Sequence, residues 1–312
     1  MTAPRDGLRE EAERRWESLA AARPDLRPAI DLQRLLVTEM IALLGCLDEQ
    51  PSAVPELDAA IAAASLARGI PALRGAPVDV PVAILGPGLD RCCRHLANGG
   101  AGEVARHLLE TFEAGRLNRG SLIAASLVRG KRAIEAGANQ MGLSPDLVWL
   151  VGELAAAPLA HRLQQRLFAA SDVTPAVGQA LEAWDRGCCP ACGSWPALIE
   201  YLTDRRLLRC SFCAAAWELR SRRCVYCGED GEAFSVSVPV AEEPRHLLES
   251  CTQCGGYTKA IRVDRPADFP LVAIADLETL ALDQAAMARE YGRPPLTEFP
   301  DDAAALARPC QD

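Results

Sequence analysis

The first half of the chain carries apolar residues at helical spacing. Between Asp31 and Leu47, leucines and one methionine recur every three or four residues, at positions 32, 35, 36, 40, 43, 44 and 47. A stripe with this period is typical of the buried face of an amphipathic helix. The pattern therefore predicts a core-forming helix over residues 31–47.

Further helices are expected as far as about residue 185. Segments 56–69, 101–117 and 120–140 show helical spacing, and the first ends at Gly69, a residue that commonly follows a helix. Ser144 and Thr174 each stand near a proline and resemble the capping residues with which helices begin. The Pro- and Gly-rich stretch 71–88 predicts a connecting loop. Residues 1–186 are thus expected to form an all-helical domain.

The pattern changes at Gly187. Short, partly alternating segments follow, separated by turn residues: ALIEYLT, RLLRC, AAWELRSRRC, AFSVSVP and YTKAIRV. Such segments are typical of small β hairpins, and helical spacing returns only after Pro270. The predicted fold is mainly α: a helical domain, two small rubredoxin-like or zinc-ribbon β modules over 187–220 and 221–265, and a C-terminal helix with a tail over 266–312.

Composition narrows the class of protein. Hydrophobic residues make up 49% of the chain and charged residues 24%, as in a folded soluble protein. The net charge of −9 argues against a general nucleic-acid binder, so no nucleic-acid partner is expected. No apolar run reaches the roughly 20 residues of a membrane span. The N-terminus has no apolar secretory signal, so a cytoplasmic location is expected.

Eight of the thirteen cysteines form four Cys-x-x-Cys pairs after Gly187. Two thiolates separated by two residues can reach one ion across a tight turn, and a second pair completes a tetrahedral shell. Seventeen residues separate the first two pairs and 23 the last two, enough for a hairpin, whereas only ten separate the second pair from the third. We therefore expect two metal sites, the first formed by Cys189, Cys192, Cys210 and Cys213 and the second by Cys224, Cys227, Cys251 and Cys254.

The sequence leaves the ion and its role open. Four cysteine ligands suit zinc or a single rubredoxin-like iron, and spacing does not distinguish these metals. A shell closed by four sulfurs disfavours a zinc hydrolase, and no catalytic residue is expected. Each ion would either hold together a β module too small to fold alone or serve redox or sensing chemistry. Cys92, Cys93 and Cys188 are expected to be packing residues or spare thiols.

Four stretches containing and following these cysteines occur in a recognisable order. They are CPACGSWPALIEY, LRCSFCAAAWELRSRRCVYCGEDGE, ESCTQCGGYTKAIR and VAIADLETLALDQAAMAREYG. Over residues 187–293 the chain thereby resembles the formate dehydrogenase accessory protein family, FdhE. One departure is Ser221, which stands between Arg220 and Arg222 where the family tends to place an arginine.

The resemblance implies a cytoplasmic, non-enzymatic maturation factor that formate dehydrogenase requires for activity. Its partner would be the immature catalytic subunit of that enzyme. Its own two ions would be iron in rubredoxin-like sites, or zinc in the same ligands. The resemblance also implies partner-binding roles for Arg222, Tyr257, Asp276 and Asp283. A homodimer is compatible with the sequence.

Two other functions are compatible with four Cys-x-x-Cys pairs. A zinc-ribbon protein of the nucleic-acid or transcription machinery could use the arginines between Arg205 and Arg223, although the acidic net charge and the large helical half argue against it. A thiol oxidoreductase would cycle one pair between dithiol and disulfide. A thioredoxin-like pair, however, lies at the start of a helix after a strand, whereas each pair here lies among short strands.

Overall fold

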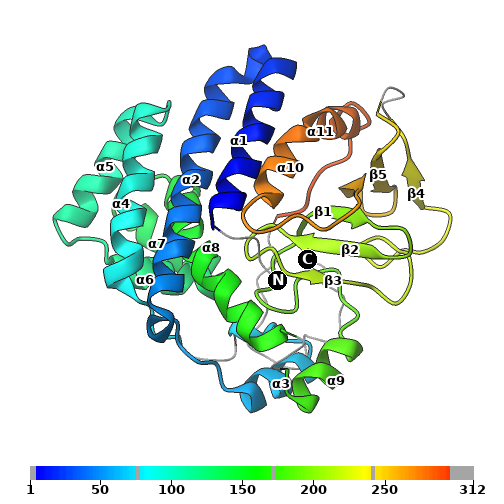
Figure 1. Cartoon of the computed structure of the whole chain (residues 1–312), viewed down its shortest axis with the longest axis horizontal. Coiled ribbons are helices and arrows are strands. Elements are labelled where there is room, and N and C mark those ends of the chain that lie inside the picture. Colours follow the sequence, from blue (N-terminus) through cyan, green and yellow to red (C-terminus); the bar gives the residue numbers. More distant parts are fainter. Residues whose placement is uncertain (1–4, 75–77, 170–172, 240–242, 296–312) are drawn as a thin grey trace. The chain divides into compact units, whose positions relative to one another are not determined.

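A computed structural model of the chain describes residues 5–74, 78–169, 173–239 and 243–295 (Figure 1). By its internal contacts the chain divides into two compact units. Unit 1 comprises residues 1–57 and 76–166, and unit 2 comprises residues 58–75 and 167–312. Unit 2 contains all four Cys-x-x-Cys pairs, and so it contains both candidate metal sites.

Unit 1 is helical throughout its described residues. Its elements are α1 (Arg5–Ala22), η1 (Pro24–Leu26), α2 (Arg27–Glu49), η2 (Pro51–Ala53), α4 (Val82–Asn98), α5 (Gly102–Glu113), α6 (Arg119–Leu127), α7 (Lys131–Gln140) and α8 (Pro145–Phe168), the last of which ends in unit 2. The predicted helix over 31–47 lies within α2, and its side chains from Leu36 to Leu47 form much of the core. Leu35 is 45% exposed, so the buried stripe is narrower than predicted.

Helix α4 corrects one prediction. It begins at Val82, inside the stretch 71–88 that the sequence predicted to be a loop, and it includes Pro87. A Cβ atom added to Gly88 would lie 2.5 Å from the Leu43 side chain of α2. The glycine therefore allows two helices to approach closely rather than forming a turn. For that reason the loop prediction was wrong for residues 82–88, whereas residues 78–81 do form an irregular connection.

Unit 2 combines helices with one six-stranded sheet. Its elements are α3 (Ala59–Ala67), η3 (Ala72–Arg74), α9 (Pro175–Ala183), β1 (Pro196–Tyr201), β2 (Arg206–Cys210), β3 (Ala216–Trp217), β4 (Phe234–Ser237), β5 (His246–Cys251), β6 (Tyr257–Arg262), α10 (Val272–Glu278) and α11 (Leu280–Met287). The strand order is β3-β2-β1-β6-β5-β4. Strands β1 and β6 pair in parallel, and the other pairs are antiparallel.

The two predicted β modules therefore share one sheet, joined through β1 and β6. Figure 1 shows α10 and α11 in orange beside the strands, and α11 packs against β5 and β6. Leu248, Tyr257, Leu282 and Ala286 are buried together there. This packing anchors the segment after the second module to the sheet, because apolar area removed from water stabilises the contact.

The domain boundaries at 186, 220 and 265 stay predictions, since contacts within one structure do not show which segments fold alone. Helix α3 and turn η3 lie in unit 2, although their sequence falls within the predicted helical domain. Part of the predicted tail, residues 296–312, lies outside the described residues. None of the described helices is both long and apolar enough to cross a bilayer.

Candidate metal centres

The first group of cysteines, group 1, consists of Cys189, Cys192, Cys210 and Cys213. One pair lies in the turn before β1, and the other consists of Cys210 at the end of β2 and Cys213 in the turn that follows. The four sulfur atoms lie within 4.8 Å of one another, and three of their separations are 3.4, 3.7 and 3.8 Å. Sulfurs arranged tetrahedrally at about 2.3 Å from a zinc ion would be about 3.8 Å apart. The side chains are thus already placed for a shared ion.

Local backbone geometry explains why these sulfurs converge. Gly193 has φ +85°, a conformation that favours glycine, and its N–H donates to the carbonyl of Cys189. The backbone N–H groups of Phe212 and Cys213 donate to Cys210 Sγ at 3.3 and 3.4 Å. Such N–H donors stabilise a thiolate, which is the form in which cysteine binds metal.

Neighbouring elements of unit 2 enclose group 1. The backbone N–H groups of Ala72 and Leu73 in η3 donate to the carbonyls of Pro190 and Ala191, inside the first turn. The indole of Trp184 donates to the carbonyl of Cys188 at 3.0 Å. Turn η3 is more than 100 residues away in sequence, and nothing in its composition indicated this role. Sequence reasoning therefore missed the element that closes the site.

The second group, group 2, consists of Cys224, Cys227, Cys251 and Cys254. One pair follows β3 and the other connects β5 to β6. The sulfurs also lie within 4.8 Å of one another, with 3.7 Å between Cys224 and Cys254 and 3.6 Å between Cys227 and Cys251. Gly228 and Gly255, which follow the two pairs, have φ +79° and +67°. Both predicted groupings of sulfurs are thus brought together, and binding of an ion by each stays a prediction.

Burial raises the pKa of several of these thiols, and in one of them hydrogen bonding outweighs it. Burial raises the pKa of Cys189 and Cys213 well above the usual value of a thiol. Burial also acts on Cys251, but backbone N–H groups of Cys254 and Gln253 and the thiol of Cys227 outweigh it and lower the pKa of Cys251. Burial also raises the pKa of Cys224 and Cys254. Because cysteine binds a metal as thiolate, an arriving ion must displace protons from both groups.

Three of the four predicted partner-binding residues meet in one charged network. Lys259 is fully buried, and its ammonium lies 2.7 Å from carboxylate oxygens of both Asp276 and Asp283. The hydroxyl of Tyr257 donates to Asp283 at 2.7 Å. Arg293 completes the network at 3.1 and 3.2 Å from the two carboxylates. The network fastens α10 and α11 to β6. No pattern in the sequence indicates that Arg293 takes part in it.

These contacts shift the pKa values of Asp276 and Tyr257. Burial alone would raise the pKa of Asp276, but Lys259 and Arg293 outweigh it and hold that pKa below its usual value. Burial, together with the neighbouring Asp283, raises the pKa of Tyr257 to about 12. At neutral pH Asp276 is therefore a carboxylate and Tyr257 a neutral phenol.

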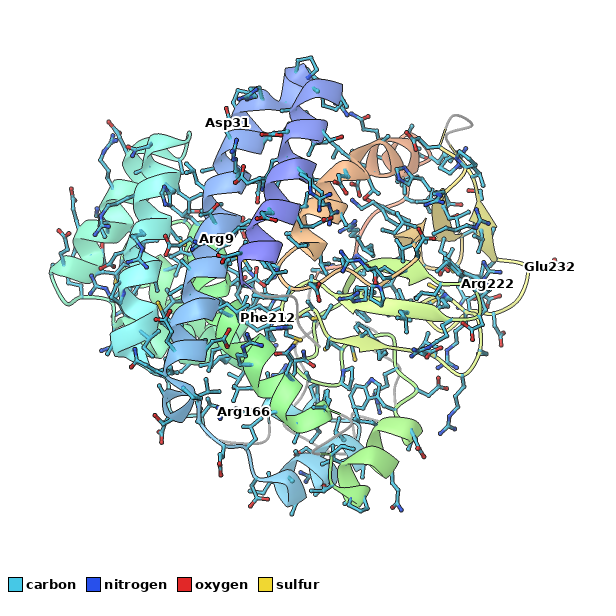
Figure 2. The ribbon with its side chains drawn as sticks, in the orientation of Figure 1. Arg9, Asp31, Arg166, Phe212, Arg222 and Glu232 are labelled. Carbon is cyan, nitrogen blue, oxygen red and sulfur yellow. The ribbon has the colours of Figure 1, made fainter. Side chains whose placement is uncertain are left out.

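Arg222 lies apart from this network. It is labelled in Figure 2, and its guanidinium donates to the Tyr201 hydroxyl at 2.8 Å and lies 5.4 Å from the centre of the Tyr201 ring. Tyr201 in turn donates to Glu249. Cys92, Cys93 and Cys188 are buried, and among the described residues only the two cysteine groups gather three or more metal-ligating side chains.

Comparison with known proteins identifies relatives that match about a third of the chain. No family model matches the chain. It is 35% identical over 109 residues to "Protein FdhE homolog" of Shewanella baltica strain OS223, and 36% identical over 118 residues to the protein of that name from Pseudomonas aeruginosa. These matches confirm the resemblance to the FdhE family. They cover 33% and 34% of this chain and only 35% and 37% of the FdhE homologues.

A solved structure extends the likeness in fold. The crystal structure of the FdhE protein from Pseudomonas aeruginosa matches with a TM-score of 0.61 over 95% of this chain and 97% of that chain. Identity across this match is 24%, so it shows a shared fold. The sequence matches thus cover about a third of the chain, whereas the likeness in fold extends through 95% of it.

Proposed function

We propose that this protein is an accessory factor for formate dehydrogenase. It binds the immature catalytic subunit in the cytoplasm through a scaffold that two metal ions stabilise, and it catalyses no reaction itself. The observation that carries this proposal is the pair of cysteine groups, each converging within 4.8 Å, in a chain with FdhE relatives and an FdhE-like fold.

The chemistry of the ligands supports a structural scaffold. Four thiolates fit zinc or a rubredoxin-like iron equally well. They fill a tetrahedral shell, so a bound ion has no free position at which to activate water. The ions would tie together the ends of strands that are too short to hold a sheet unaided, as in other small metal-dependent modules.

The arginines of the segment 205–223 do not favour the nucleic-acid alternative. Arg205 pairs with Glu218, Arg206 with Glu249, and Arg223 with Asp185. Arg209 is buried against Glu200. A surface that binds phosphates needs cations available to replace counterions. Here the charges are largely neutralised within the chain itself.

Partner-binding roles stay proposed for four residues: Arg222, Tyr257, Asp276 and Asp283. The structure supports two kinds of role, direct contact with the partner and support of the docking surface. Arg222 is exposed and has a phenol rather than a carboxylate beside it, so its charge can attract an acidic surface. Tyr257 is only 5% exposed. We propose that the Tyr257–Asp283 pair supports the docking surface from within, whereas Arg222 touches the partner.

Capture of the partner tests the function. An affinity-tagged chain is expressed in formate-grown cells, and co-purifying proteins are identified by mass spectrometry. The wild type and Cys46→Ser, a control thiol of α2 outside both groups, are expected to recover the catalytic subunit. Cys251→Ser is expected to lose it together with one ion. Recovery of RNA polymerase or ribosomal proteins without any dehydrogenase subunit would favour the nucleic-acid alternative instead.

A further inference from the structure

The two cysteine groups differ in their access to solvent. In group 1 all four cysteines are buried, and none is more than 1% exposed. In group 2, Cys224 and Cys251 are buried, whereas Cys227 is half-buried and Cys254 is exposed. The sulfur cages have the same ligand chemistry, so any difference in their reactivity must come from their surroundings.

The surroundings of group 1 are closed. Both carbonyls inside its first turn accept hydrogen bonds from η3, and Phe212, within its second turn and labelled in Figure 2, is 3% exposed. Every residue from Cys188 to Glu200 is buried. An external molecule can reach this cage only after part of unit 2 opens, which requires breaking these contacts.

The surroundings of group 2 are open on one side. A Cβ atom added to Gly228 or Gly255, which follow its two turns, would have no neighbour within 4 Å. The open space thus lies beside both turns, on two separate segments of the chain. Tyr226 covers the inner side, where a Cβ on Gly256 would meet its ring at 2.7 Å. Group 2 is therefore packed on one side and accessible through Cys254 on the other.

We propose that group 2 is an exchangeable metal centre whose ion external thiolates and small chelators can reach through Cys254, whereas group 1 keeps its ion for as long as unit 2 stays folded. In the exchange step a bond forms between the incoming sulfur and the ion, and the bond from Cys254 Sγ to the ion breaks. The ion keeps its oxidation state, and the freed Cys254 thiolate takes a proton from water. This inference rests on the metal binding proposed above and goes beyond it.

Metal-release kinetics test the inference on the full chain. The protein is loaded with two equivalents of zinc and mixed with the chromogenic chelator 4-(2-pyridylazo)resorcinol. Release is expected in two phases of one zinc each, with the fast phase at least about tenfold faster, because only group 1 requires local opening. Glutathione is expected to accelerate the fast phase and leave the slow phase unchanged.

Alkylation of the wild-type protein assigns the two release phases to the two cysteine groups, and two variants then check the assignment. N-ethylmaleimide is added during release, and modified cysteines are identified by peptide mass spectrometry. Cys254 is expected to react first, followed by Cys224, Cys227 and Cys251. Cys254→Ser is expected to retain only the slow phase, and its matched counterpart Cys213→Ser only the fast phase.

The possible outcomes separate this inference from the proposed function. A single release phase for both ions, or early alkylation of group 1, overturns the inference and leaves the accessory function untouched. Two phases assigned as expected support it, even if no dehydrogenase subunit is captured. A chain that binds no zinc or iron overturns the inference and the metal-stabilised scaffold together.

Discussion

Lys259 is one of two lysines in the sequence, and its side chain is fully buried. A buried ammonium is costly unless other charges and hydrogen bonds replace its water. Here Asp276 and Asp283 supply a carboxylate each, and the carbonyl of Asp276 accepts a further hydrogen bond. Two helices are thereby fixed to one strand through a single side chain.

Replacing that side chain is expected to destabilise unit 2. Lys259→Met keeps most of the volume but leaves Arg293 as the one cation of the network beside the two carboxylates, with Tyr257 still donating to Asp283. The expected loss in the free energy of unfolding is about 3 kcal/mol, at the lower end for a broken buried pair because Asp276 is 40% exposed. Urea unfolding of the metal-loaded protein measures it.

The other lysine provides a matched control. Lys131 lies 3.5 Å from Glu135 on the surface of α7, with 39% of its side chain exposed. Lys131→Met is expected to change the free energy of unfolding by less than about 0.5 kcal/mol, as for other exposed pairs. Equal effects of the two substitutions would show that the buried network contributes no special stability.

At the scale of elements, the backbone just before the first Cys-x-x-Cys turn contacts the backbone of the third turn. A Cβ atom at Gly187, just before the first turn, would lie 1.6 Å from the carbonyl oxygen of Val225 in the third. A side chain could rotate away from such a clash, but a backbone cannot. The position of one module relative to the other thus depends on a residue without a side chain.

Gly187→Ala is therefore expected to separate the two turns and destabilise unit 2 by at least about 2 kcal/mol, in the range of overpacked sites. Gly178→Ala is the control, because Gly178 lies in α9 with nothing within 4 Å of an added Cβ. That change is expected to be neutral or to stabilise by up to about 1 kcal/mol. Thermal unfolding of both variants compares them. A Gly187→Ala protein as stable as the wild type would contradict the close contact.

Each cysteine group is expected to hold its ion independently, since the two cages share no ligand. Cys210→Ser should release one of two ions and Cys227→Ser the other, as measured by native mass spectrometry. A serine hydroxyl is a far weaker ligand for zinc or iron than a thiolate. Loss of both ions from either variant would instead indicate a single cooperative centre.

Sequence alone predicted the local part of this architecture. The helical period of residues 31–47 and the spacing of the cysteine pairs depend on neighbours in the chain, and the structure contains α2 and both sulfur clusters. The parallel pairing of β1 with β6 could not be predicted, because it joins residues about 60 positions apart, such as Ile199 and Ala260. The same holds for Gly88 and Gly187, whose role depends on which distant atoms lie opposite them.

For the molecule as a whole, the two units differ in what holds them together. Unit 1 has an apolar core of leucines, including Leu43, Leu85 and Leu108, none of them exposed. The sheet of unit 2 consists of strands of two to six residues. Such short strands bring few residues each to the sheet, and the turns converge on thiols that burial disfavours as free anions. We therefore expect unit 2 to be the part whose folding depends on an ion.

Removal of metal is therefore expected to act on one unit. After chelation under reducing conditions, amide hydrogens of β1, β2, β5 and β6 should exchange rapidly, while those of α2 and α4 keep their protection. Metal binding free energy in such sites is folding free energy, so its loss removes the stability of the strands but not of the helical core. Hydrogen-exchange mass spectrometry measures both units in one sample. Adding zinc or ferrous iron back should restore protection of the strands, which separates metal loss from oxidation damage. Unchanged exchange of the strands in a sample shown to be free of metal would mean that the sulfur cages are not what stabilises the sheet.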